Sequence, residues 1–499
     1  MALMLGIDLG TSGVKTIAVN PEGKILSSYS VLYDLIQPRP GWSEQSAGDW
    51  WDAVVESIRG VLSDSAVDVA EVKALSLSGQ MHGSVFLDKA GEVIRNPLLW
   101  NDTRTTAQCK WITDQLGEEA LIGFVGNPAL EGFTAPKLIW LRDNEPENYN
   151  RVHTLMLPKD YIVYKLTGRR STEMSDAAGS LLLDVGNRSW SAEVAKALNI
   201  DMAILPEVLE ATDVVDTISS EISQLTGLST KVKVVAGGAD NACGAVGNGI
   251  VKEGIALASI GTSGVVLAHT DSMQHDRGGR IHSFNHAVPH SWYLMGVMLS
   301  AGMSLSWLKN EIIRSNYEDL NTQAAKIAPG SEGVVFLPYL YGERTPHRNP
   351  TARGNFFGLS GFHTQGHIIR SVFEGVAFGL RDSLDLIKGL GVNPSEIRVT
   401  GGGAKSQLWR QILADVFQAQ VITLEADEGP AFGAALLAGV GAGIYRDIDQ
   451  AVDQTIRTNG FTDPDKQNMK RYDEVYGLFR SLYQALEPQY AKAFKLFNS

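Results

Sequence analysis

Cysteine and positive charge are both scarce in this chain, and each shortage excludes a class of protein. The 499 residues include two cysteines, Cys109 and Cys243, in unrelated surroundings. Two such thiols make neither a disulfide framework nor a set of metal ligands, and they indicate reduced, buried side chains in a cytoplasmic protein. The formal net charge is −13, which argues against nucleic acid or an anionic membrane surface as the main partner.

Long hydrophobic runs are missing as well. Residues 1–8 have no basic lead and no long apolar core, so we expect no signal peptide there. The longest stretch of small apolar residues, 430–444, is interrupted by glycines and is too short to span a bilayer. It predicts a tightly packed helix and a turn. The length of the chain predicts at least two domains.

Glycine is abundant, with 51 residues, and it is concentrated in motifs. The motif Asp8-Leu-Gly-Thr-Ser-Gly13 near the start is repeated as Ser259-Ile-Gly-Thr-Ser-Gly264 about half the chain later. Each copy interrupts a run of strand-like residues, so each predicts a tight turn between two strands. A strand–turn–strand unit repeated at this separation predicts two mixed α/β domains of one kind that face each other, 1–248 and 249–499.

These two turns are candidates for binding phosphate. Their backbone amides and hydroxyls, including those of Thr11 and Ser12, can surround an anion, and Asp8 can hold a hydrated divalent cation against it. Lys15, two residues past the first turn, can reach a phosphate oxygen. The alternative is a pair of purely structural hairpin turns, and the presence of two copies makes this the minority interpretation.

Two further glycine loops follow predicted strands. Gly401-Gly-Gly-Ala-Lys-Ser406 precedes a helix pattern and resembles a nucleotide loop, although it fits neither the Walker A nor the GxGxxG spacing. In the loop Ala236-Gly-Gly-Ala-Asp-Asn241, Asp240 lies at the edge of a sheet where α/β proteins bind ligands. The local sequence leaves two roles open for Asp240: a general base for an attacking hydroxyl, or the cap of the next helix.

Two clusters of polar and aromatic residues complete the candidates. Gly79-Gln-Met-His-Gly83 and Trp100-Asn-Asp-Thr-Arg104 follow apolar, strand-like runs. Amides, carboxylates and imidazoles beside an aromatic or thioether face are suited to a polyol. The alternative for His82 is a buried histidine whose hydrogen bonds are satisfied within the protein, which is the commoner fate of a lone histidine.

Longer patterns resemble those of a known family. Gly132–Asn144 and Gly354–Glu374 match the two signature patterns of the FGGY carbohydrate kinases, within the superfamily of sugar kinases, actin and chaperone ATPases. The resemblance extends from Ile7 to about Ala435. It implies two duplicated ribonuclease H-like domains of the actin/hexokinase type around a central cleft, with the sugar and the base on the first domain and the nucleotide on the second.

Shorter motifs are similar to the branch of this family that converts D-xylulose to D-xylulose 5-phosphate with ATP and Mg²⁺; they lie at residues 79–83, 100–102, 158–161, 175–179 and 336–347. The resemblance favours Asp240 as the base. It implies sugar contacts from Met81, His82, Trp100, Asp240 and Asn241, and a water-mediated metal contact from Asp8. The implied nucleotide contacts are Thr11, Ser12, Lys15, Gly261, Thr262, Gly302, Trp307, Gly402, Gly403 and Gln407, where Gln407 replaces an asparagine of some relatives.

Other functions stay open at this point. A kinase of the same family could act on ribulose, xylitol or gluconate, although the residues 79–83 argue against it. A non-enzymatic ATPase-fold protein, such as an actin-like filament or a sugar-sensing regulator, is the alternative of another class. A regulator would carry an added DNA-binding module, for which residues 1–7 leave no room. Homodimers are common among relatives, so a homodimer is the expected assembly.

Overall fold

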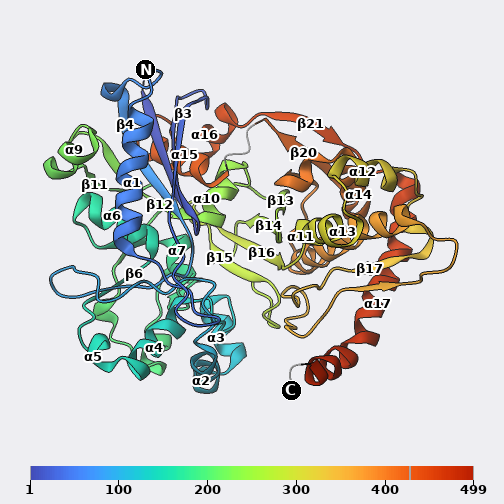
Figure 1. The fold of residues 1–499 in the computed structure, drawn as a ribbon. Coiled ribbons are helices and arrows are strands. Elements are labelled where there is room, and N and C mark those ends of the chain that lie inside the picture. The colour runs from blue at the N-terminus through green and yellow to red at the C-terminus, as the bar shows by residue number, and fades with distance from the viewer. Residues whose placement is uncertain (1, 426–428, 498–499) are drawn as a thin grey trace.

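Two β-sheets organise the chain in the computed structural model, which describes residues 2–425 and 429–497 (Figure 1). The first sheet has six strands in the order β11-β12-β4-β1-β2-β3: Val214–Thr217, Lys233–Ala239, Val72–Gly79, Leu3–Leu9, Gly13–Val19 and Ile25–Leu32. The second has seven in the order β15-β16-β14-β13-β19-β20-β21: His282–Asn285, Trp292–Met298, Gly264–Thr270, Ile255–Ile260, Glu396–Thr400, Gln420–Leu424 and Thr458–Thr462.

The two sheets share a central motif. In the first sheet, β1 runs antiparallel to β2 and parallel to β4. In the second, β13 runs antiparallel to β14 and parallel to β19. Both Gly-Thr-Ser-Gly motifs therefore join the antiparallel strands of equivalent hairpins, and the predicted duplicated α/β fold is confirmed.

Helices cover the first sheet on both faces. The helices α1 (Ala47–Leu62) and α6 (Pro158–Thr167) pack on the face from which Leu5 and Ile7 project. The opposite face contacts α10 (Asp240–Gly247) and α15 (Gly429–Ala442). The other elements of this lobe are α2 (Thr106–Leu116), α3 (Glu118–Val125), α4 (Thr134–Asn144), α5 (Pro146–Tyr149), α7 (Met174–Ala178), α8 (Ala192–Ala197), α9 (Ser220–Thr226), β5 (Val85–Leu87), β6 (Thr154–Met156), β7 (Ser171–Glu173), β8 (Leu183–Asp184), β9 (Ser189–Trp190) and β10 (Glu207–Leu209).

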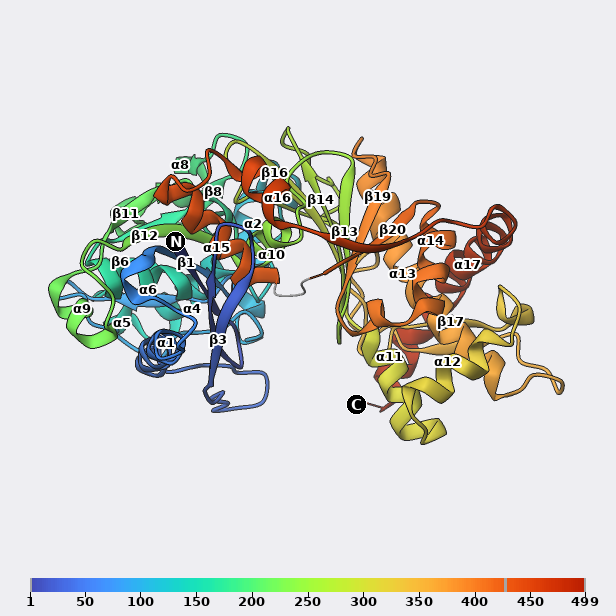
Figure 2. The same ribbon diagram turned by 90° about the horizontal axis from the view of Figure 1, so that it is seen from above.

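The second half of the chain contributes helices to the first lobe. In Figures 1 and 2, α15 and α16 (Ile448–Thr455) lie among the elements of the first sheet, before β21 returns to the second. A close approach at Gly6 allows this packing, because a Cβ there would lie 1.9 Å from the carbonyl oxygen of Ala431. The strand β1, which carries Asp8, is therefore held between elements that are distant in the sequence.

The second lobe has its own core on one face of its sheet and joins the first lobe on the other. The long helix α13 (Gln365–Gly389) and α14 (Gln407–Phe417) pack on the first of these faces with α17 (Lys466–Phe497) outside them. From the other face, Leu267, Phe284 and Tyr293 enter the core of the first lobe. The remaining elements are α11 (Gly302–Trp307), the π-helix Leu308–Ile313, α12 (Tyr317–Ala325), β17 (Val335–Leu337) and β18 (Asn355–Phe357).

The structure can be compared with the predictions for the two cysteines, for the apolar stretch 430–444 and for membrane-spanning helices. Both cysteines are buried and carry free thiols, as predicted. The apolar stretch 430–444 forms most of α15 and its following turn, as predicted. Within the described residues, no helix combines the length and the apolar character that a bilayer span requires.

Candidate active site

A cavity of about 380 Å³ opens between the two lobes where strands of both sheets end. The strands β1 and β2 contribute Asp8 and Lys15, which pair across the antiparallel register. The start of α10 contributes Asp240 and Asn241, and the end of β19 contributes Thr400. The structure thus brings together four residues that were singled out from separate motifs: Asp8, Lys15, Asp240 and Asn241.

Asp240 begins α10 immediately after β12, so its carboxyl group projects from the end of a strand into this cavity. Its Oδ1 accepts hydrogen bonds from the backbone amide of Asn241 at 2.6 Å and from the side-chain amide of Asn241 at 3.0 Å. Burial and the negative charge of Asp8 raise the pKa of Asp240 to about 7, against the lowering effect of these hydrogen bonds. A carboxyl group with this pKa can exchange a proton near neutral pH.

Asp8 has the property expected of a group that holds a hydrated cation. Burial raises the pKa of Asp8, and the positive charge of Lys15 lowers it. Its Oδ1 atom is buried and has no hydrogen-bond partner among the described residues. Such an atom fits a water molecule or a hydrated Mg²⁺. The described residues contain no group of three or more His, Cys, Asp and Glu side chains that could hold a metal ion.

Side chains of the first lobe fix the turn after β1. The amide of Gly10 donates to the carbonyl of Gly13 at 3.0 Å, which closes the turn. The indole Nε1 of Trp100 donates to Thr11 Oγ1 at 2.9 Å, and Gln45 Nε2 donates to the carbonyl of Thr11 at 2.7 Å. Trp100, expected at the sugar, therefore also contacts the candidate phosphate turn. Gln45 carries no motif or periodicity that could have indicated this contact.

The candidate sugar residues Met81 and His82 are not among the residues that line this cavity, but Met81 contacts Asn241, which is. The side-chain amide of Asn241 is 3.4 Å from Met81 Sδ, and the hydroxyl of Tyr293 is 3.9 Å from the same sulfur. His82 Nδ1 lies 2.7 Å from the carbonyl oxygen of Gly179. Burial lowers the pKa of His82 to about 3, so the ring is neutral, Nδ1 carries the proton, and Nε2 is left as an acceptor.

A buried charge cluster lies behind Asp240. Lys159 Nζ is 2.6 Å from Asp160, 3.6 Å from Glu173 and 3.7 Å from Asp176. The hydroxyl of Ser175 donates to Glu173 at 2.9 Å and accepts from the amide of Ala239, the residue before Asp240, at 3.0 Å. Burial raises the pKa of both Glu173 and Asp176. Because one lysine faces three carboxyl groups, the arrangement favours retention of a proton by the carboxyl groups. The sequence assigned no role to these residues.

A larger cavity of about 560 Å³ in the second lobe contains five of the ten predicted nucleotide residues. Gly261, Thr262, Gly302, Gly402 and Gly403 all line it. Tyr317, Glu318 and Asn321 were missed because α12 carries no recognisable motif. The other lining residues, to which the sequence assigned no individual role, are Ile260, Met303, Leu305, Ser306, Phe373, Lys405, Ser406 and Trp409.

Five of the predicted nucleotide residues lie outside this lining: Thr11, Ser12 and Lys15 belong to the first lobe, and Gln407 and Trp307 belong to the second. Gln407 is the exposed first residue of α14, and Trp307 packs against the core of the second lobe. Between them, Ser406 and Asn321 are joined by a hydrogen bond at the cavity wall. The contacts that the resemblance implies for Gln407 and Trp307 therefore stay predictions.

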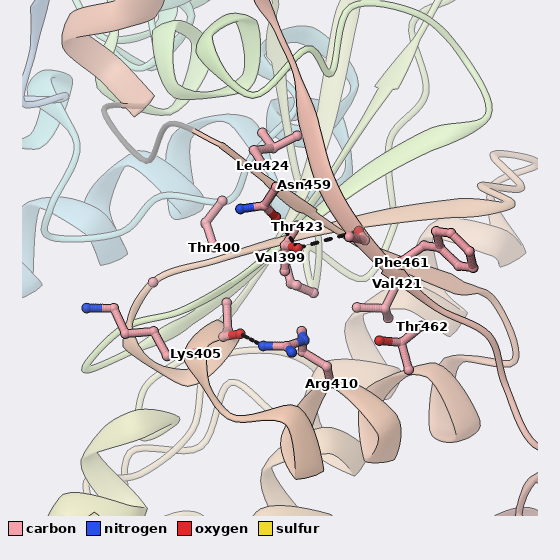
Figure 3. Close-up of a pocket in the computed structure, with 13 residues that line it drawn as sticks. Val399, Thr400, Lys405, Arg410, Val421, Thr423, Leu424, Asn459, Phe461 and Thr462 are labelled. Carbon is pink, nitrogen blue, oxygen red and sulfur yellow. Dashed lines mark hydrogen bonds between the residues drawn. The ribbon is translucent and has the colours of Figure 1, made fainter.

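The glycine loop 401–406 has a second cavity, of about 400 Å³, on its other side (Figure 3). Arg410 Nη1 donates to the carbonyl of Ala404 at 2.7 Å and so anchors the loop to α14. Thr423 and Asn459 face it from β20 and β21 and bond to each other at 2.6 Å.

Comparison with known proteins supplies an independent finding. The model of the N-terminal domain of the FGGY family of carbohydrate kinases matches residues 3–247, and that of its C-terminal domain matches residues 256–442. A xylulose kinase of Bacillus subtilis strain 168 is 42% identical over 484 residues, which cover 97% of this chain and 97% of that protein.

Solved structures match the fold equally well under two different names. A ligand-bound xylulose kinase from Lactobacillus acidophilus has a TM-score of 0.93 at 26% identity, covering 99% of this chain and 100% of that one. A gluconate kinase from the same organism also has a TM-score of 0.93 at 26% identity, covering 98% of this chain and 99% of that one. Similarity of fold alone therefore does not identify the substrate.

Proposed function

Because the chain belongs to the FGGY family of carbohydrate kinases and is a sugar kinase, we propose that it phosphorylates D-xylulose with ATP to give D-xylulose 5-phosphate. The observation that carries the proposal is Asp240. This carboxyl group, with its pKa raised to about 7 by burial and by Asp8, lies at the cavity between the lobes beside Asn241, which also contacts Met81. The xylulose kinase of Bacillus subtilis, similar over 97% of both chains, supports this sugar over other ketoses and polyols.

Asp240 is the proposed general base. Its carboxylate accepts the proton of the terminal hydroxyl of the sugar while that oxygen attacks the γ-phosphorus and ADP leaves. The transition state of such a transfer is loose and leaves little charge on the attacking oxygen, so orientation contributes more than basicity. Asn241 supports this orientation because it fixes one oxygen of Asp240 and leaves the other for the sugar.

Met81, His82, Asn241 and Trp100 are the proposed sugar contacts. The neutral His82 ring offers Nε2 as an acceptor for a sugar hydroxyl, and Met81 offers an apolar face. These residues all belong to the first lobe, which is the proposed sugar-binding domain, 1–248.

The two Gly-Thr-Ser-Gly turns are the proposed phosphate contacts, through Thr11, Ser12, Lys15, Gly261 and Thr262. Gly302, Gly402 and Gly403 would contact the rest of the nucleotide in the larger cavity. Magnesium, when bound with the nucleotide, neutralises charge that develops on the phosphate oxygens. The unpartnered Oδ1 of Asp8 would hold its water shell. Closure of the lobes would exclude water, which otherwise competes with the sugar as acceptor.

A coupled assay of ADP release across a panel of sugars tests the proposed substrate. We expect the highest kcat/KM with D-xylulose, compared side by side with D-ribulose, xylitol, D-gluconate and glycerol. A higher kcat/KM with any of the other four would contradict the choice of sugar. Sedimentation of the protein after addition of ATP, without sugar-dependent ADP release, would favour a filament instead.

A further inference from the structure

The candidate sugar residue His82 lies at the centre of an unusual turn. Its φ angle is 67°, and the amide of Gly83 donates to the carbonyl of Met81 at 2.8 Å. A three-residue turn with a positive φ at a non-glycine residue is rare and strained. Such a conformation persists only where surrounding contacts hold it.

Two buried side chains of α4 hold the carbonyl group of His82. Thr134 Oγ1 donates to this oxygen at 3.0 Å, and Lys137 Nζ donates to it at 2.9 Å. Lys137 also donates to the carbonyl of Gly132. Both side chains are 0% exposed, and their spacing of three residues places them on one side of the first turn of the helix. Two side chains of a single helix, α4, therefore hold the strained turn through the carbonyl group of His82.

Lys137 differs from an ordinary buried lysine. Among the described residues, no ion pair involves Lys137, whereas the other fully buried lysine, Lys159, contacts three carboxyl groups. Burial lowers the pKa of Lys137 to about 7. Burying an amine that has only carbonyl acceptors is costly, and packing alone gives no reason for it.

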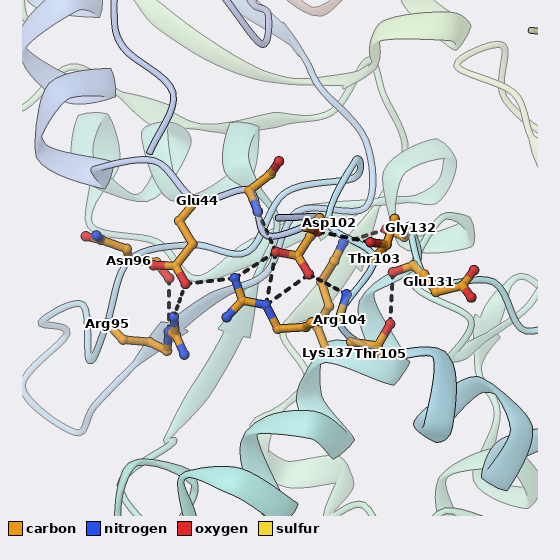
Figure 4. Close-up of polar contacts among 12 residues, drawn as sticks. Glu44, Arg95, Asn96, Asp102, Thr103, Arg104, Thr105, Glu131, Gly132 and Lys137 are labelled. Carbon is orange, nitrogen blue, oxygen red and sulfur yellow. Dashed lines mark hydrogen bonds and ion pairs between the residues drawn. The ribbon is translucent and has the colours of Figure 1, made fainter. Parts of the chain in front are cut away.

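The nearby carboxylate of Asp102 forms its hydrogen bonds with other residues (Figure 4). Both of its oxygens bond to Arg104, at 2.7–3.0 Å, and Oδ2 also accepts from the amide of Ser43 at 2.6 Å. Arg104 in turn contacts Glu44 at 2.8 Å and lies 3.7 Å from the ring centroid of Trp42. Lys137 is thus left with the carbonyl oxygens of Gly132 and His82 as its partners.

We infer that Lys137, with Thr134, is a positioning residue that fixes the Met81–His82 turn and thereby sets the affinity for the sugar. The inference rests on the proposed role of this turn in sugar binding. The clamp holds Met81 against Asn241 and directs the His82 ring, whose Nδ1 bonds to Gly179. The positive charge of Lys137 also contributes to keeping His82 neutral, and hence an acceptor.

The test removes the donors without changing the size of the side chains. In Lys137→Met, we expect the dissociation constant of D-xylulose, measured by calorimetry, to rise about tenfold to a hundredfold, as for a lost hydrogen bond from a charged donor. In Thr134→Val, about threefold to tenfold is expected. The KM for ATP and kcat at saturating sugar should change less than about threefold in either variant. Lys110→Met, at an exposed lysine of the neighbouring helix α2, is the control and should match the wild type.

A double-mutant cycle separates positioning from general stabilisation. If Lys137 acts through His82, most of its effect on the sugar dissociation constant should disappear in a His82→Ala background. Equal effects in both backgrounds, or a loss of ATP binding in parallel with sugar binding, would overturn the inference. Should Lys137→Met fold poorly, the same cycle with Thr134→Val gives the answer.

Measurements on the wild type distinguish a failure of this inference from a failure of the proposed substrate. If the wild type turns over D-xylulose but both variants bind it normally, the positioning role is wrong and the proposed function stands. If the wild type prefers another sugar, the substrate is wrong, and the same variants are measured with the preferred sugar.

Discussion

The two sides of the cleft are built in opposite ways. On the proposed sugar side, side chains that contact each other fill the space: Met81 contacts Asn241 and Tyr293, and His82 is fixed at both its ring and its carbonyl group. On the proposed nucleotide side, four glycines leave backbone amides open to a ligand among the larger side chains of the wall; they are Gly261, Gly302, Gly402 and Gly403.

This difference teaches which changes each side tolerates. Where side chains contact the ligand, substitutions that remove atoms should weaken binding. Where backbone groups contact the ligand, substitutions that add atoms should weaken binding. Burial shifts the pKa of three groups, Asp240, His82 and Lys137, and all three lie on the proposed sugar side. Four changes follow from this contrast, beginning with the one of largest expected effect.

Removing the charge of Asp240 should have the greatest consequence. In Asp240→Asn we expect kcat to fall by about 10²–10⁴, the usual contribution of a positioned general base. Binding of ADP, measured by calorimetry, should stay within about twofold of the wild type. A variant that turns over at the normal rate and loses only sugar affinity would contradict the role of Asp240 as the base.

Removing the ring of His82 should affect the sugar alone. His82→Ala is expected to weaken D-xylulose binding by about 1–3 kcal/mol, the cost of one buried hydrogen bond, while the KM for ATP stays constant. Steady-state kinetics with each substrate varied in turn provides the measurement. If the KM for the sugar does not change, His82 is not part of the sugar site.

Adding one carbon atom at Gly302 should affect the nucleotide alone. A Cβ at this position would lie 2.4 Å from the carbonyl oxygen of Gly261, in the wall of the larger cavity. In Gly302→Ala we expect the KM for ATP to rise about tenfold, since small overpacking costs about 1–3 kcal/mol. Gly477→Ala, where a Cβ meets nothing within 4 Å, is the matched control. An equal rise in the sugar KM would show that the two sides are not separable.

Shortening Gln407 should have the smallest effect. Its side chain is exposed at the start of α14 and lies outside the lining of the nucleotide cavity. Gln407→Ala is therefore expected to change the KM for ATP by less than about twofold, because surface substitutions away from specific contacts are close to neutral. A tenfold rise would mean that Gln407 reaches the adenosine in a closed form, as the family resemblance implies.

Much of the fold could be predicted because its signals are local. Each Gly-Thr-Ser-Gly turn is flanked by its own strands, and the apolar stretch 430–444 reads as a helix by itself. The packing of α15 on the first sheet could not be predicted in this way. It depends on the absence of a side chain at Gly6, more than 400 residues before the helix that fills the space, and no local pattern connects the two.

The residues of the candidate site differ in the same way: those with a local sequence signal were predicted, and those placed by distant contacts were missed. Asp8 and Asp240 were found because each belongs to a glycine motif beside a predicted strand, and the structure places both at one cavity. Tyr293 was missed because it reaches Met81 from the other sheet, across 212 residues of sequence. Lys137 was noticed only as part of a signature pattern, since its contact with the carbonyl of His82 depends on a turn that the sequence does not reveal.

The pH dependence of kcat/KM for D-xylulose tests the central role of Asp240 most directly, because this ratio reports groups of the free enzyme. Burial and Asp8 raise the pKa of Asp240 to about 7, so its proton-accepting form is lost as the pH falls through that value. We predict that kcat/KM falls about tenfold per pH unit below about 7, with the same break in His82→Ala and in Lys137→Met, which lacks the lysine whose pKa burial also lowers to about 7. A profile that stays flat from pH 5.5 to 8, roughly the range that a pKa near 7 would dominate, would contradict the account.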